Sequence, residues 1–168
     1  MSSKEILISA IAILVAFGGY FLWKNTPEQQ INERIESLVE VLEYRKVSLD
    51  NRQNRHEILR EILAETVSFE GSPPVPDGEI GISTITERLD FLHTMTSWVE
   101  IIETDRKMLL KRDTAQVRLD CVVKAAAGQQ FKTEEDWVII LDFEVIDDEW
   151  KIAHIEATSQ WESSAAGL

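Results

Sequence analysis

The sequence is short of several residue types, and each shortage excludes a class of function. Cys121 is the only cysteine, so no disulfide can form within the chain and multi-cysteine zinc sites are excluded. The metalloprotease, EF-hand, P-loop and dinucleotide-binding signatures are all missing, and we expect no metal or other cofactor. Basic residues are scarce, with 17 Lys and Arg against 30 Asp and Glu. The net charge of −13 argues against nucleic acid as a partner, since that needs Lys and Arg to displace counterions.

Charged side chains are absent from Ile6 to Trp23, a run of 18 residues. A helix of this length spans about 27 Å, close to the hydrocarbon thickness of a bilayer. Tyr20 and Trp23 lie at its C-terminal end, where aromatic rings prefer the headgroup zone, and Lys4 and Lys24 flank it. The pattern predicts a transmembrane anchor over residues 1–24 that contacts the membrane through residues 6–23.

The alternative to an anchor is a cleaved signal peptide. Glu5 stands in the n-region, the apolar run is long, and no A-x-A site follows it, so we favour an anchor that is retained. The tail before the first charges is short, which favours a single-pass protein with its domain on the non-cytoplasmic side. Residues 25–168 are then the soluble domain.

Helical periodicity dominates the first half of this domain. Thr26 and Pro27 are typical of an N-cap and first helical position, and apolar residues at three- and four-residue steps predict a helix to about Val47. A second helix is capped by Ser48 or Asp50, and a third runs from about residue 83 to 93. His56 and His93 are expected to be exposed. Between the last two helices we expect a short strand at 67–69 and a loop over 71–81.

From Trp98 onward the period changes from 3.6 to 2 and predicts strands at 98–111, 114–126, 129–146 and 149–160. The connections between them are short turn signals, typical of antiparallel hairpins. Cys121 fits this alternation as a small buried side chain. Helices followed by an antiparallel meander predict an α+β fold with three helices packed on one face of a curved antiparallel sheet.

This element order, together with the acidic turn and Trp-x-Ile signal inside the closing run from Asp142 to Glu156, resembles the nuclear transport factor 2-like superfamily and its SnoaL-like branch. The strand end at 69–71 and the strand at 114–119 fit the same pattern. The resemblance implies a cone of cystatin-like topology whose interior can hold a small ligand. That superfamily contains isomerases, dehydratases and hydrolases beside non-catalytic members, so the resemblance implies a fold and leaves the activity open.

The hairpin at Asp147 and Asp148 predicts which residues share a face. Odd positions from 137 to 145 then face even positions from 150 to 158, which gives a mainly apolar surface that we expect to line the cone. Its members include Trp137, Phe143, Trp150, His154 and Glu156. A His and a Glu in an apolar cavity suit ligand contact or acid–base chemistry. The alternative is that His154 bonds a neighbour while Glu156 emerges at the rim.

The opposite face of the sheet mixes charged and apolar residues, among them Asp120, Val122, Ile140 and Asp142. The resemblance implies that this face forms a dimer interface, and a solvated sheet is the alternative.

The interior predicted in this way is crowded with aromatic rings and poor in titratable groups. We therefore expect a membrane-anchored, non-enzymatic binding or assembly domain, working as a homodimer or in an envelope complex. The alternative is a small-molecule enzyme or lipophilic-ligand carrier that uses the cone.

Overall fold

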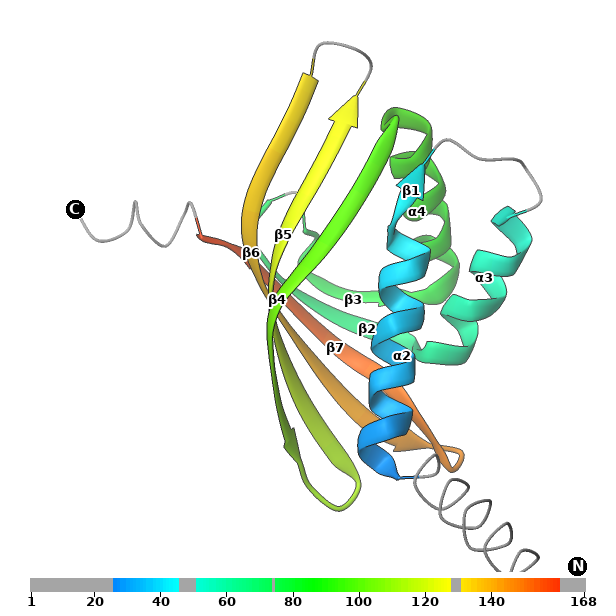
Figure 1. The fold of residues 1–168 in the computed structure, drawn as a ribbon. Helices are drawn as coiled ribbons and strands as arrows, with labels where there is room; N and C mark the ends of the chain where they lie inside the picture. Colours follow the sequence, from blue (N-terminus) through cyan, green and yellow to red (C-terminus); the bar gives the residue numbers. More distant parts are fainter. Residues whose placement is uncertain (1–25, 46–50, 74, 128–130, 161–168) are drawn as a thin grey trace, which may run out of the picture.

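The computed structural model describes residues 26–45, 51–73, 75–127 and 131–160 (Figure 1). The described residues form helices α2 (Pro27–Leu42), α3 (Asn51–Ile62) and α4 (Ile82–Met95), and strands β1 (Tyr44–Arg45), β2 (Leu63–Gly71), β3 (Gly78–Gly81), β4 (Trp98–Leu110), β5 (Thr114–Ala127), β6 (Phe131–Ile146) and β7 (Glu149–Ser159). The expected α+β order is confirmed.

The predicted membrane anchor, residues 6–23, lies outside the described residues. Within the described part, no helix is long and apolar enough to cross a bilayer.

The strands form one seven-stranded sheet in the order β1-β4-β5-β6-β7-β2-β3. The prediction of a purely antiparallel sheet is wrong at one place, because β2 pairs with β7 in parallel. Between β2 and β7 the chain forms β3, α4, β4, β5 and β6, so the connection is long enough for a parallel pair. The predicted loop over 71–81 is also wrong in part, since Gly78–Gly81 is strand β3 and pairs with β2.

The hairpin turn at Asp147 and Asp148 forms as the sequence indicated. These residues have φ angles of 53° and 66°, the left-handed conformation that a two-residue turn of type I′ requires at both positions. Ile146 pairs with Glu149 directly across this turn. Short polar side chains tolerate that conformation better than branched ones, which is why two aspartates can form the turn.

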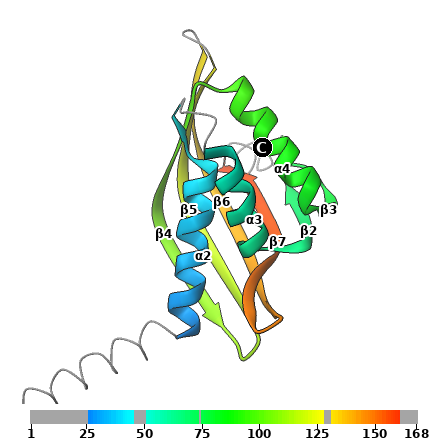
Figure 2. The same ribbon diagram turned by 90° about the vertical axis from the view of Figure 1, so that its right-hand side faces the viewer.

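The helices cover the concave face of the curved sheet (Figures 1 and 2). Helix α2 begins as predicted, with Thr26 Oγ1 accepting a hydrogen bond from the backbone N–H of Gln29 at 3.3 Å. It ends earlier than predicted, because Glu43 is extended and the chain enters β1, which pairs with β4. The buried stripe of α2 consists of Ile31, Ile35, Leu38 and Val41. It packs into one core cluster with buried residues of β5, β6 and β7.

Helix α4 lies farther along the sheet, against α3, β2 and β3. Its buried stripe is Thr86, Leu89 and His93. The expectation that His93 is exposed is therefore wrong, because the helix runs on to Met95 and turns this side chain inward, where it is 6% exposed.

Candidate functional site

A bulge in β7 decides which residues reach the interior of the cone. Val145 pairs with Trp150 and Phe143 with Ile152, but the next pair is Asp142 with His154. Ala153 is thus an extra residue without a partner on β6, and it reverses the alternation of every residue after it.

The prediction that His154 and Glu156 look into the cone is therefore wrong. Both lie on the convex face, where His154 is opposite Asp142 of β6 and Ser68 of β2. Glu156 is opposite Ile140 of β6 and Glu70 of β2. The interior positions of β7 belong instead to Ile155, Ala157 and Ser159, and the last two are buried.

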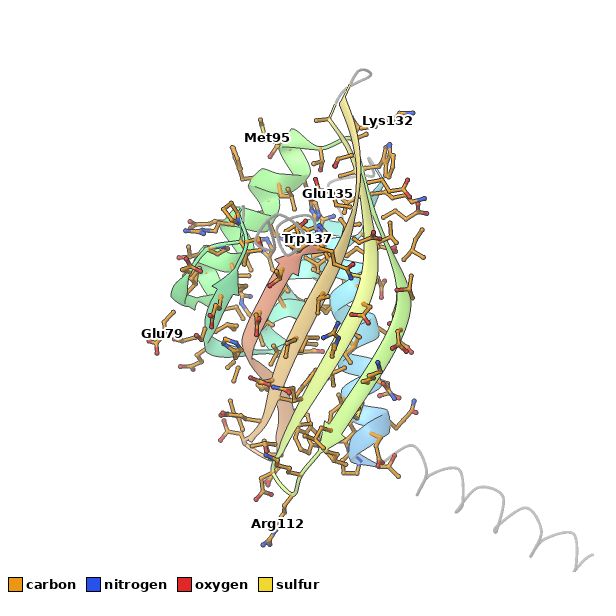
Figure 3. The ribbon with its side chains drawn as sticks, turned by 90° about the vertical axis from the view of Figure 1, so that its left-hand side faces the viewer. Glu79, Met95, Arg112, Lys132, Glu135 and Trp137 are labelled. Carbon is orange, nitrogen blue, oxygen red and sulfur yellow. The ribbon has the colours of Figure 1, made fainter. Side chains whose placement is uncertain are left out.

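The four residues predicted to form an interface do lie on the convex face. Asp120, Val122, Ile140 and Asp142 alternate along β5 and β6 with the buried core positions. Asp120 accepts a hydrogen bond from the Arg118 guanidinium at 3.1 Å, and Asp142 accepts one from the Gln116 amide at 2.9 Å. The face is a ladder of paired polar side chains with apolar ones between them, and Figure 3 views it from the front.

Phe143 and Trp150, predicted to line a ligand cavity, are part of the packed core. Phe143 is 0% and Trp150 5% exposed, and both belong to the cluster that α2 and α3 cover. The lower half of the cone is thus filled by the protein's own side chains.

The upper half of the concave face is different because β5 and β6 extend beyond α2 and α3 (Figure 1). Strand β6 has 16 residues and extends over about 50 Å, whereas the 16 residues of α2 rise only about 24 Å. Figure 1 shows β5 and β6 continuing beyond α2 and α3. The sheet residues of the core cluster accordingly end at Leu119 and Ile139.

Beyond those two residues, two rows cross the concave face. One row is Glu103, Cys121, Trp137 and Ser159, and the next is Ile101, Val123 and Glu135. We call these seven residues the concave mouth. Cys121 and Ser159 are buried at its floor, while Trp137, Val123 and Ile101 are half-buried. Trp137 is the one predicted cone residue that lies in this surface.

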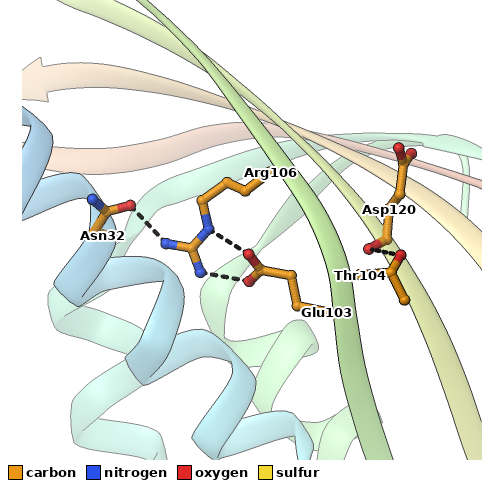
Figure 4. Close-up of polar contacts among 5 residues, drawn as sticks. All are labelled: Asn32, Glu103, Thr104, Arg106 and Asp120. Atoms are coloured by element: carbon orange, nitrogen blue, oxygen red, sulfur yellow. Dashed lines mark hydrogen bonds and ion pairs between the residues drawn. The ribbon is translucent and has the colours of Figure 1, made fainter.

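An ion pair closes the side of the mouth next to α2. The Arg106 guanidinium donates to both carboxylate oxygens of Glu103 and, through Nη1, to Oδ1 of Asn32 on α2 at 2.6 Å (Figure 4). A bulge at Thr104 brings this about, since Glu103 and Arg106 then face the same side of β4. The Thr104 hydroxyl donates to the carbonyl of Asp120 at 2.9 Å and holds the bulge.

The ionisable groups of the mouth are Cys121, Glu103 and Glu135. Burial, with the nearby charges of Asp120 and Glu103, raises the pKa of the Cys121 thiol to about 11, so the group is a neutral thiol at pH 7. The Glu103 carboxylate is held by Arg106, and Glu135 is exposed. In the described part of the chain, no three His, Cys, Asp or Glu side chains gather closely enough to hold a metal ion.

A second polar group lies between α3 and α4, and no pattern in the sequence indicated it. His56 Nε2 lies 3.1 Å from a carboxylate oxygen of Asp90, and His93 is buried nearby. Burial lowers the pKa of His93, and the positive charge of Arg55 lowers it further. The contact between His56 and Asp90 links helices α3 and α4.

Comparisons with known proteins place the fold. No protein-family model matches the chain, and no curated protein does. Solved structures do match. An NTF2-like protein with a cystatin-like fold from Novosphingobium aromaticivorans aligns over 90% of this chain and 92% of its own, at 16% identity and a TM-score of 0.61.

Two more solved structures match over most of their length. An NTF2-like superfamily protein from Salmonella enterica covers 78% of this chain and 89% of its own, at 15% identity and a TM-score of 0.61. A proposed dehydratase of the NTF2-like family from Streptomyces avermitilis covers 80% of this chain and 98% of its own, at 16% identity and a TM-score of 0.60. Structural matches at identities this low establish the architecture of the chain and leave its chemistry open. The fold of this chain is that of the nuclear transport factor 2-like superfamily.

Proposed function

We propose that the chain is a membrane-tethered binding protein whose concave mouth holds a small, largely apolar molecule. The observation that carries the proposal is the overhang of β5 and β6. It leaves Trp137 and Val123 half-buried on a curved surface that α2 and α3 do not cover. A concave apolar wall with a few polar groups at its edge is the usual form of a small-molecule site.

The mouth favours binding over catalysis. General acid–base chemistry needs a titratable group with a free proton-accepting atom beside the substrate. Here Glu103 is paired with Arg106, the Cys121 thiol stays protonated, and Glu135 is exposed to solvent. The structural neighbours include a proposed dehydratase, and a carrier and a dehydratase can use the same cone, so that likeness supports a ligand in the mouth more than it supports a reaction.

The tether in this proposal is the apolar run from Ile6 to Trp23, with the domain on the non-cytoplasmic side. Membership of the SnoaL-like branch is part of the same proposal. It is supported by the acidic turn at Asp147 and Asp148 and the Trp-x-Ile signal that follows. The tether would keep the mouth close to a ligand that partitions into the bilayer, and the domain could then take that ligand from the membrane.

The chain offers a matched pair of variants for the test. Val123 points into the concave mouth, while its neighbour Val122 lies on the convex face, and both side chains are half-buried. The full chain is placed in lipid nanodiscs with an alkyl diazirine, irradiated, and digested for mass spectrometry. We expect labelling of the peptides that contain Trp137 and Val123, besides the labelling of residues 6–23 that a membrane tether requires.

Val123→Glu should reduce the labelling of the mouth by about tenfold or more, because a carboxylate must lose water to lie against an apolar ligand. Val122→Glu should leave that labelling unchanged. Equal labelling of the mouth in Val123→Glu and in the unaltered chain contradicts the ligand site. Absence of label in residues 6–23 contradicts the tether alone.

A second candidate function is assembly through the convex face, in a homodimer or an envelope complex. It is favoured by Ile102, which is 41% exposed and pairs with Val122 in the middle of the sheet. Assembly predicts that Val122→Glu lowers the particle mass measured by light scattering, whereas Val123→Glu does not. The same two variants therefore separate the two functions.

A further inference from the structure

The lower end of the convex face carries a groove outside the mouth. Its volume is about 250 Å³, and its polar lining consists of Lys111, Thr114, Gln116, Asp142 and Glu144. The exposed side chain of Leu109, at 59%, forms its rim. Three strands build the groove, since β4, β5 and β6 each contribute to it.

Charges of opposite sign line this groove without neutralising each other. Neither the Lys111 ammonium nor the Glu144 carboxylate has a hydrogen bond or ion pair to any side chain in the described ranges. Asp142 is different, because its Oδ1 accepts from the Gln116 amide at 2.9 Å and its carboxylate is fixed in place. The groove therefore offers one cationic donor at one side and two anionic acceptors at the other.

From this arrangement we propose that the groove binds a zwitterion that carries a phosphate and a primary ammonium, as the headgroup of phosphatidylethanolamine does. Lys111 and the Thr114 hydroxyl donate to the phosphate oxygens. The ammonium has three N–H donors, enough to reach Glu144 and Asp142 together. A phosphate alone is repelled by the two carboxylates, and an amine alone leaves Lys111 without a partner.

The position of the groove selects a lipid as the source of this headgroup, and this step rests on the membrane tether proposed above. Helix α2 begins at Pro27, so only residues 24–26 separate it from the apolar run. The four steps from Trp23 to Pro27 reach at most about 14 Å, which keeps the start of α2 close to the bilayer surface. The β4–β5 hairpin tip lies at the same end of the molecule, as Figure 1 and the position of Arg112 in Figure 3 show.

The first experiment tests the groove without any bilayer lipid. Soluble glycerophosphoethanolamine is titrated into the full chain, and the backbone amide shifts of Lys111, Thr114 and Glu144 are followed by NMR. We expect saturable shifts at these three amides. Lys111→Ala and Glu144→Gln should each weaken binding about tenfold or more, the loss that accompanies one hydrogen bond between charged groups. Lys132→Ala, at the other end of the sheet, should have no effect (Figure 3).

Two outcomes of that titration overturn the proposal. Equal shifts with inorganic phosphate show a site for anions only. Equal affinity for glycerophosphocholine, which has no N–H donors on its nitrogen, shows that the carboxylates do not bind an ammonium.

The second experiment tests the lipid source. The full chain is placed in nanodiscs with equal amounts of phosphatidylethanolamine and phosphatidylcholine, and retained lipids are identified by native mass spectrometry. We expect phosphatidylethanolamine to be enriched on the unaltered chain and on Lys132→Ala, and the enrichment to be lost in Lys111→Ala. The same enrichment in Lys111→Ala, after a positive headgroup titration, assigns the groove to a soluble zwitterion and overturns the lipid assignment. Failure of the chain to enter nanodiscs contradicts the tether and the lipid assignment. The headgroup titration then decides alone whether the groove binds a zwitterion.

Discussion

Gly71 offers the sharpest test of the sheet topology, because it lies in the parallel pair that the sequence did not predict. It pairs with Ala157 of β7, and its φ of +156° is one that L-residues rarely adopt. A Cβ placed on Gly71 would lie 2.0 Å from the carbonyl oxygen of Ala157. That oxygen also accepts a 3.0 Å hydrogen bond from the backbone N–H of Ser72, which is buried. Gly71→Ala must therefore push β2 and β7 apart.

The cost of Gly71→Ala has three parts. Backbone strain adds about 1 kcal/mol or more, forced displacement in a packed region about 1–3 kcal/mol, and a buried N–H left without its acceptor about 1–3 kcal/mol. The parts overlap, and we expect a loss of about 3–5 kcal/mol from the free energy of unfolding, a large fraction of the stability of an ordinary domain. Urea unfolding of the full chain, followed by tryptophan fluorescence, measures it.

Alanine substitutions at two other glycines, Gly78 and Gly81, distinguish the cost of backbone strain from the cost of a steric clash. Gly78 has a φ of +96°, and a Cβ placed there would meet nothing within 4 Å, so Gly78→Ala should cost only the strain, about 1 kcal/mol. Gly81 has an ordinary φ, and the atom nearest to its Cβ position is 4.0 Å away, so Gly81→Ala should change stability little. If Gly71→Ala costs no more than Gly78→Ala, the parallel pairing of β2 with β7 is wrong as described.

Two further predictions concern buried titratable groups. Because the pKa of His93 is lowered from 6.5 in the fold, the unfolded chain binds its proton more tightly. The stability that neutral His93 gives is therefore complete above about pH 6.5 and is lost as the pH falls below it. Between about pH 7.5 and about pH 5.5, the urea midpoint should therefore drop less in His93→Asn than in the unaltered chain. An equal drop in both proteins contradicts the burial of this imidazole. Since the Cys121 pKa is about 11, alkylation by iodoacetamide at about pH 8 should be more than about a hundredfold slower in the fold than in urea, and mass spectrometry would reveal equal rates if the thiol were accessible.

Much of the fold follows from local patterns in the sequence. The four long strands lie within a few residues of their predicted ends, because turn residues punctuate them and alternation extends over ten positions or more. The cap at Thr26 and the turn at Asp147 were predicted correctly for the same reason, since each depends on neighbouring residues only. Strand β3 was missed because its four residues have no internal pattern, and only pairing with β2 makes them a strand.

Residues that depend on distant neighbours were harder to predict. His93 was assigned to the surface because it stands at the end of an apolar pattern, and its burial depends on how α4 lies against the rest of the domain. The half-exposure of Trp137 likewise follows from the length of α2, which ends at Leu42 where the sequence pattern continues to Val47. An early end to the helix leaves Trp137 outside the part of the sheet that α2 covers.

One residue, Ala153, accounts for the error over the candidate site. The sequence contained a signal of the bulge, since the apolar residues of β7 change phase between Ile152 and Ile155. Strict alternation from Trp150 places His154 on the same face as Ile152, whereas the observed pairing sets it opposite Asp142. A bulge absorbs a phase change of this kind and lets both apolar sets face the core.

The position of that bulge also bears on the choice between catalysis and binding. With His154 on the concave face, an imidazole would lie near Leu141, on the core side of the mouth, and an acid–base mechanism would have a base there. With His154 opposite Asp142, the imidazole instead joins the polar ladder of the convex face. The carboxylates of the mouth are then Glu103, which is paired with Arg106, and the exposed Glu135. The extra residue thus takes the imidazole off the concave face, which supports the proposal that this face binds a ligand.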